Sequence, residues 1–60
     1  MYKKQKLLLV EDQACFALSL KTFLSNYAND IKVVGIAENG KIGSALADKL
    51  KPDVILMDVR

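Results

Sequence analysis

Residues 52–58 read PDVILMD, and this stretch decides the fold. Its centre is a run of four apolar residues close behind a proline, a pattern that predicts a short strand buried on both faces. A carboxylate stands at each end, with Asp53 at the exposed entrance and Asp58 where the strand leaves the core. In open parallel sheets, ligands bind in the crevice beyond the carboxyl ends of the strands. Asp58 is therefore the first candidate functional residue.

Four further elements are expected before this strand. Residues 7–10 (LLLV) are apolar without alternation, which predicts a central strand of a parallel sheet. Residues 13–26 carry apolar side chains at helical spacing. Residues 31–37 predict a second strand, which is less uniformly apolar and is therefore placed nearer an edge. A second helix is expected over residues 41–51, because Pro52 stops it.

The helical spacing also predicts which side chains face the core. On the first helix these are the residues recurring at intervals of three and four: Phe16, Leu20, Phe23, Leu24 and Tyr27. Cys15 is expected to be a small buried residue of the first turn rather than a reactive thiol. On the second helix the expected buried face carries Ile42, Leu46 and Leu50. Gly43 costs that helix roughly 1 kcal/mol relative to alanine, and close packing would explain its presence.

The totals limit the class of protein. Sixty residues predict one domain, residues 1–60, and a net charge of +2 gives no argument for nucleic acid or a membrane surface. No apolar run approaches the roughly 20 residues that span a bilayer, and none of signal-peptide length follows the basic N-terminus. A single cysteine fits a reducing cytoplasm. The absence of histidine excludes His-based catalysis and His metal ligation within these residues.

Two strand orders are compatible with a βαβαβ chain and right-handed crossovers. In the order 2-1-3 the helices cover opposite faces, and Glu11 and Asp12 meet Asp58 at one mouth, on strands about 4.8 Å apart. In the order 3-2-1 a whole strand separates Asp58 from the acid pair. Asp12 also stands where the N-cap of the first helix is expected.

Three carboxylates at one strand mouth repel one another, and a hard divalent cation relieves that repulsion. Mg²⁺ binds to a few carboxylate oxygens and keeps several waters. Beside such a metal, an aspartate oxygen can attack a phosphoryl group and hold it as an acyl phosphate. The order 2-1-3 therefore predicts a magnesium site with an acceptor aspartate.

Three motifs in register resemble the receiver domain of two-component response regulators. Residues 7–13 (LLLVEDQ) and 51–60 (KPDVILMDVR) resemble its first and third strands. Residues 31–40 (IKVVGIAENG) are similar to the branch that carries a LuxR/NarL-type helix-turn-helix effector. The likeness covers nearly the whole chain from Lys6 onward. It implies a CheY-like, flavodoxin-like α/β fold with a parallel sheet, here truncated to βαβαβ with strand order 2-1-3.

The resemblance implies a role for each site residue. Asp58 would be the phosphoacceptor and Asp12 a direct Mg²⁺ ligand. Glu11 would hold the metal through water, and the backbone carbonyl of Arg60 would be the remaining protein ligand. The phosphoryl donor would be a phosphohistidine on a separate sensor histidine kinase. The chain would not be an enzyme, and the parent protein would be a cytoplasmic transcriptional regulator whose effector domain, outside this chain, binds DNA.

The chain also departs from the family pattern. It ends just after the third of five strands, so the family's switch Ser/Thr and phosphate-binding Lys have no counterpart. Lys49 and Lys51 are expected at the opposite end of the sheet and cannot substitute for that lysine. We therefore expect weak metal binding and poor phosphorylation. Residues 54–57 would be an apolar edge that favours self-association, although an ending straight after the acceptor motif favours a fragment of a longer protein.

Two other functions are compatible with the sequence. The chain could be a dimerisation or docking module that performs no phosphate chemistry. It could also be the first half of a nucleotide-binding α/β enzyme. The loop after the first strand disfavours the enzyme, because it offers two acids where a pyrophosphate requires glycines and helix N–H groups.

Overall fold

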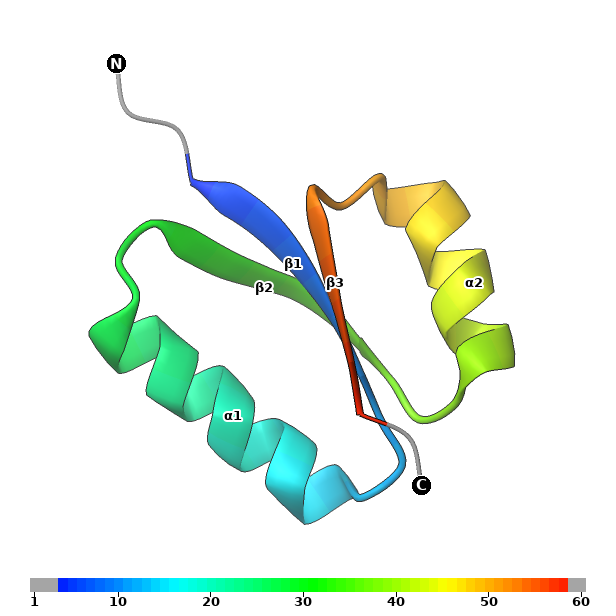
Figure 1. Cartoon of the computed structure of the whole chain (residues 1–60), viewed down its shortest axis with the longest axis horizontal. Coiled ribbons are helices and arrows are strands. Elements are labelled where there is room, and N and C mark those ends of the chain that lie inside the picture. The colour runs from blue at the N-terminus through cyan, green and yellow to red at the C-terminus, as the bar shows by residue number, and fades with distance from the viewer. Residues whose placement is uncertain (1–3, 59–60) are drawn as a thin grey trace.

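The computed structural model describes residues 4–58, with the backbone alone at Asp58. The elements are β1 (Gln5–Glu11), α1 (Ala14–Tyr27), β2 (Ile31–Ala37), α2 (Gly40–Leu50) and β3 (Val54–Asp58). The strands form one parallel sheet in the order β2-β1-β3, and the two helices cover its opposite faces (Figure 1). The βαβαβ architecture and the strand order 2-1-3 are confirmed, and the order 3-2-1 is excluded.

The core is built around β1, the central strand. Leu7 and Leu9 pack on the α1 side of the sheet, and Leu8 and Val10 pack on the α2 side. All four are buried, because β1 has a helix on each face and a strand on each side. Burial of each such side chain contributes about 1.5–3 kcal/mol. The uninterrupted apolar run of residues 7–10 therefore indicates a strand that is buried on both faces, as predicted.

A bulge in β2 redirects its side chains. The pairing of β2 with β1 advances by one extra residue at Val34. Because a bulge shifts the side-chain alternation by one residue, Ile31 and Val33 before it pack with the α1 cluster, whereas Ala37 after it packs with the α2 cluster. Regular alternation would have placed all three on one face. β2 lies at the edge of the sheet, as its mixed composition predicted.

Helix α2 approaches the sheet closely at Gly43. This glycine is buried, and a Cβ added to it would lie 2.9 Å from Cγ2 of Val10 and 3.6 Å from Cβ of Ala37. The prediction that Gly43 permits close packing is confirmed. The expected burial of Ile42 is wrong, since Ile42 is 38% exposed. The face that meets the sheet is centred on Gly43, which turns the neighbouring Ile42 outward.

The predicted core face of α1 is partly wrong. Ala17 is buried, and Leu20 and Leu24 pack on the same cluster. The residues expected in the core but found exposed are Cys15, Phe16, Phe23 and Tyr27. A three-stranded sheet buries only a narrow stripe of a helix lying on it, so these residues remain on its flanks. The rings of Phe23 and Tyr27 pack against each other instead, with centroids 4.9 Å apart.

The expectation that residues 52–58 form a strand buried on both faces is also wrong. Among residues 4–58, β3 pairs with β1 alone and forms an edge of the sheet. Its apolar residues, Val54 to Met57, are between 42% and 55% exposed. The separate prediction that residues 54–57 form an exposed apolar edge is therefore confirmed. Neither helix in the described part of the chain is long and apolar enough to cross a membrane.

The close approach at Gly43 predicts opposite effects for two alanine substitutions in α2. Gly43→Ala should lower the free energy of unfolding, because overpacking against Val10 costs about 1–3 kcal/mol, more than the roughly 1 kcal/mol gained from helix propensity. Gly40→Ala is the matched control, since a Cβ there meets nothing within 4 Å. It should leave stability unchanged or slightly raised. Urea denaturation measures both, and equal stability of the two variants would contradict the packing.

Candidate functional site

The carboxyl ends of β1 and β3 bring the acidic residues to one edge of the sheet. Glu11 pairs with Asp58 at the last position of both strands, and Asp12 follows Glu11 in the chain. The two strands are direct neighbours. This backbone arrangement is the one that a shared site for the acid pair and Asp58 requires.

Glu11 is buried although it is charged. Its side chain is 1% exposed, and its Oε2 accepts a hydrogen bond of 2.9 Å from the backbone N–H of Gln13. Gln13 occupies the N-cap position of α1 and makes no capping hydrogen bond through its own side chain. The carboxylate of Glu11 therefore fixes the turn that leads from β1 into α1.

The expected N-cap role of Asp12 is wrong. The turn after β1 is one residue longer than predicted, so Gln13 rather than Asp12 occupies the N-cap position. Asp12 is exposed at the edge of the sheet. Its carboxylate is thus accessible to a ligand from solvent.

A cavity of about 300 Å³ opens beside this acid pair. Its lining comes from the carboxyl ends of β1 and β2, the residues just after them, and the starts of the two helices: Glu11, Asp12, Ala14, Ile36, Glu38 and Ile42. Glu38 is a carboxylate that the sequence analysis missed. The signal was present, because Glu38 follows β2 directly, as Asp12 follows β1, and the carboxyl ends of parallel strands meet at one edge.

The predicted magnesium site rests partly on atoms outside the described residues. The side chain of Asp58 and the carbonyl of Arg60 belong to this part. Among the described side chains, no group of three or more His, Cys, Asp or Glu could hold a metal ion. The residues at hand still fit the ion in kind, because Glu11 and Asp12 supply hard carboxylate oxygens beside the end of β3. The ligand set stays a prediction.

The other end of β3 is occupied by structural contacts. Oδ2 of Asp53 accepts a hydrogen bond of 2.8 Å from the backbone N–H of Lys6, and the Asp53 N–H donates to the Lys6 carbonyl at 2.8 Å. Asp53 thereby fastens the start of β3 to β1. Lys49 lies in the last turn of α2 and Lys51 directly after it, at the end of β3 opposite Asp58, as predicted.

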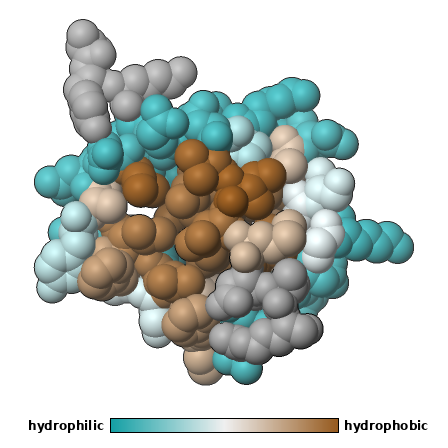
Figure 2. All heavy atoms as spheres, viewed as in Figure 1, coloured by the Kyte–Doolittle hydropathy of each residue, from teal (hydrophilic) through white to brown (hydrophobic). Residues whose placement is uncertain are grey.

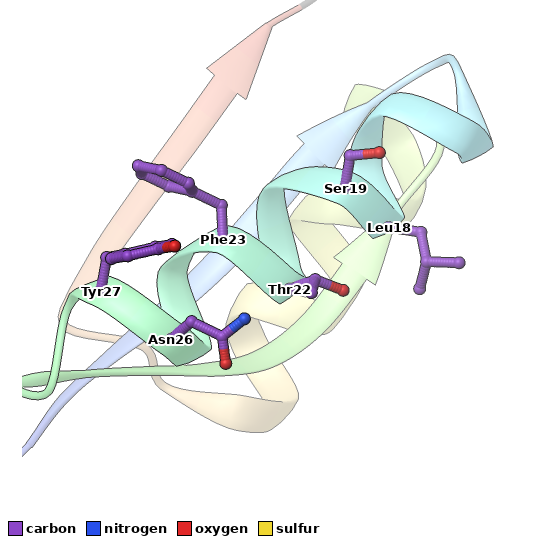
Figure 3. Close-up of a pocket in the computed structure, with 6 residues that line it drawn as sticks. All are labelled: Leu18, Ser19, Thr22, Phe23, Asn26 and Tyr27. Carbon is purple, nitrogen blue, oxygen red and sulfur yellow. The ribbon is translucent and has the colours of Figure 1, made fainter.

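A larger hollow of about 450 Å³ lies on the outer surface of α1. Figure 3 shows that all the residues lining it come from this one helix: Leu18, Ser19, Thr22, Phe23, Asn26 and Tyr27. It contains neither a carboxylate nor a cation, and it does not include the acidic edge. Its side chains suit contact with another molecule better than chemistry.

Comparison with known proteins gives a consistent set of relatives. The chain is 44% identical over 90% of its length to a protein-glutamate methylesterase/protein-glutamine glutaminase of Methanococcoides burtonii. It is 44% identical over 90% of its length to the transcriptional regulatory protein YdfI of Bacillus subtilis, and 43% identical over 90% to the response regulator protein VraR of Staphylococcus aureus. No family model matches the chain.

The chain spans only 15% of the methylesterase and 25% of each of the two regulators. The matched segment is therefore shared by a methylesterase/glutaminase and by two regulatory proteins. The similarity is therefore to a segment that these proteins have in common.

The contact between Glu11 and Gln13 predicts a stability difference between two substitutions. Glu11→Ala should lower the free energy of unfolding by about 1–3 kcal/mol, because the N–H of Gln13 loses a charged acceptor. Glu11→Gln keeps a side-chain oxygen at this position and should lose clearly less. Urea denaturation together with amide exchange at Gln13 measures the difference. An equal loss in both variants would mean that the hydrogen bond does not hold the turn.

Proposed function

We propose that this chain, which belongs to the receiver (CheY-like) family of two-component response regulators and matches the N-terminal part of that domain, is a phosphoacceptor that takes up a phosphoryl group on Asp58. The observation that carries the proposal is the pairing of Glu11 with Asp58 at the ends of neighbouring strands. This pairing places Glu11, and Asp12 directly after it, at the strand end next to Asp58. The three acidic residues could therefore bind the same cation.

The reaction we propose is transfer from a phosphohistidine of a sensor histidine kinase. A carboxylate oxygen of Asp58 attacks the phosphorus, the P–N bond breaks, and the imidazole leaves and takes up a proton. The product is an aspartyl phosphate. Asp12, Asp58 and the backbone carbonyl of Arg60 would hold Mg²⁺ directly and Glu11 through water. The bound ion would offset the negative charge on the transferring oxygens.

The described residues give each acid a different task in this scheme. Asp12 is exposed and offers its carboxylate to the metal. Glu11 is buried, and its hydrogen bond to Gln13 holds the turn that carries Asp12. Glu38 lines the same cavity and adds negative charge to its mouth. The acidic edge therefore favours a divalent cation before any phosphoryl donor approaches.

The two regulators among the relatives support a proposal for the biological setting. We infer a cytoplasmic phosphorelay protein whose parent is a transcriptional regulator, of the LuxR/NarL-type branch, that binds DNA through an effector domain outside this chain. The chain itself would be a signalling acceptor rather than an enzyme, although the methylesterase relative is one.

A second candidate function is a docking module without phosphate chemistry. The exposed apolar residues of β3 favour it, because an unpaired strand edge is a template for another chain. In this case the chain would associate with itself through β3, and Asp58→Asn would leave the association unchanged. The two candidates are compatible, since one uses the end of β3 and the other uses its edge.

Incubation with acetyl phosphate and Mg²⁺, followed by intact-mass measurement, tests the acceptor. For residues 1–60 we expect slow, substoichiometric addition of one phosphoryl group that requires Mg²⁺, because these residues contain no counterpart of the switch hydroxyl and the phosphate-binding lysine that the resemblance implies. Asp58→Asn should abolish the addition. Asp53→Asn, at the other end of the same strand, is the matched control and should retain the addition. The asparagine side-chain oxygen can still accept the hydrogen bond from the backbone N–H of Lys6.

Each result of this experiment decides between the candidates. Labelling that survives Asp58→Asn would remove Asp58 as the acceptor. A complete lack of labelling in the unmodified chain would favour the docking module. Fast and stoichiometric labelling would support the acceptor and would show that the missing hydroxyl and lysine are dispensable.

A further inference from the structure

The acidic cavity extends beyond the two strands that would hold the metal. It lies between the ends of β1 and β2 and the starts of both helices, and none of the described residues that line it belongs to β3. Because the sheet order is β2-β1-β3, Glu38 at the end of β2 lies on the far side of Asp12 from Asp58. The additional separation is one strand spacing, about 4.8 Å. Glu38 is therefore beside the proposed metal site but outside it.

The arrangement of the carboxylates argues against Glu38 as a metal ligand. Glu11, Asp12 and Glu38 line one cavity, yet among the described side chains no group of three carboxylates could hold one ion. Glu38 is nevertheless close to the acid pair. A cavity of about 300 Å³ is roughly 8 Å across, which is one Debye length at physiological ionic strength. The charge of Glu38 can therefore act on an ion at the acid pair without coordinating it.

The position of Glu38 is fixed by its two neighbours in the chain. Ala37 before it is buried and packs beneath α2, and Asn39 after it caps α2 by accepting a hydrogen bond of 2.9 Å from the N–H of Ile42. Glu38 itself is exposed. Ile36 and Ile42 line the same cavity, and apolar walls of this kind focus the field of a charge into the space between them.

The other charges at the cavity leave the field of Glu38 uncompensated. The proposed ligands Glu11, Asp12 and Asp58 carry more negative charge than Mg²⁺ carries positive charge. The N-terminal ends of α1 and α2 both lie at the cavity. Each carries about half a positive charge, so that together they offset about one carboxylate. Lys41, in the first turn of α2, is exposed and does not line the cavity.

The remaining charges of residues 4–58 lie further away. In Figure 2 hydrophilic side chains surround an apolar centre, so the charges are distributed along the margins of the molecule. The charged residues at or near the amino ends of the strands are Lys4, Lys6, Asp30, Lys32, Lys49, Lys51 and Asp53. The seven residues of β1 separate the two ends of the sheet by about 20 Å, which is more than two Debye lengths. Lys21 and Asp48 lie about 10 and 12 Å along their helices from the cavity end.

We propose that Glu38 is a specificity-determining residue of the acceptor site and that it acts through its charge alone. Its negative field has two opposite consequences. It attracts a divalent cation, and it repels a free phosphoryl donor that is itself an anion, such as acetyl phosphate. A phosphohistidine on a protein escapes this repulsion where basic side chains lie beside it. This role, which rests on the acceptor function proposed above, would favour a protein-borne donor over small anionic donors.

Titration of Mg²⁺ without a phosphoryl donor, followed by NMR at the backbone amides of residues 11–13, tests the first consequence. Glu38→Gln should raise the dissociation constant of Mg²⁺ about threefold in about 20 mM salt. The difference should disappear near about 0.5 M salt, because an interaction through solvent is screened. Glu38→Asp keeps the charge and should retain the affinity. Asp48→Asn removes an exposed charge far along α2; it is the matched control and should change nothing.

Labelling by acetyl phosphate at saturating Mg²⁺ tests the second consequence. Glu38→Gln should be labelled about twofold faster than the unmodified chain, because the anionic donor meets less repulsion. Phosphoramidate, whose protonated nitrogen lowers its net negative charge, should gain less. A substitution that merely damaged the site would weaken Mg²⁺ binding and slow the labelling together. Opposite signs in the two measurements therefore identify an effect of charge, and urea denaturation establishes that each variant is folded.

Each contrary result has a definite meaning. Unchanged Mg²⁺ affinity in Glu38→Gln, or an equal change in Asp48→Asn, would overturn the proposed field of Glu38. A loss of affinity that persists at high salt would also overturn it and would make Glu38 a ligand. A labelling rate that does not rise would overturn the selection between donors. If the unmodified chain takes up no phosphoryl group, the acceptor function and the donor selection fail together, and the titration still decides whether Glu38 attracts the cation.

Discussion

The structure depends on the complete enclosure of β1. This strand has a helix on each face and a strand on each side, so its apolar residues are buried whichever way they point. A strand in that position can only be central, and both β2 and β3 must then align with it. The juxtaposition of Glu11 and Asp58 follows from this enclosure, because both strands end at the same edge. The burial of four aliphatic side chains therefore fixes where the acidic groups lie.

The site is tied to the core by packing as well as by strand order. The bulge at Val34 sends Ala37 beneath α2, and Gly43 leaves room for that helix to approach. The α2 start and its capping residue Asn39, whose side chain accepts a hydrogen bond from the N–H of Ile42, lie directly after β2. Glu38 therefore lies between Ala37, which packs beneath α2, and Asn39, which caps that helix. A change in the packing of α2 would therefore be transmitted to the acidic cavity.

Much of the fold could be predicted from the sequence, because buried strands and turn residues leave local patterns. The uniform apolar runs identified β1 and β3, and the acids at their ends identified the edge. The misplaced residues of α1 share one physical cause. Helical spacing gives the apolar side of a helix but not how much of it the sheet can cover, so Phe16 and Tyr27 were placed in the core.

Other features required the three-dimensional register. The sequence of residues 31–37 does not reveal the bulge at Val34, and the packing of Ala37 beneath α2 depends on that bulge. The N-cap of α1 moved from Asp12 to Gln13 because Glu11 satisfies the backbone of the turn. That hydrogen bond depends on the burial of Glu11. Because glutamate is mostly exposed in proteins, the sequence does not suggest this burial.

The two candidate functions use the same strand. Residues 54–57 of β3 are exposed, and the last position of the strand is Asp58, the proposed acceptor. Whatever covers this edge therefore also forms one wall beside Asp58.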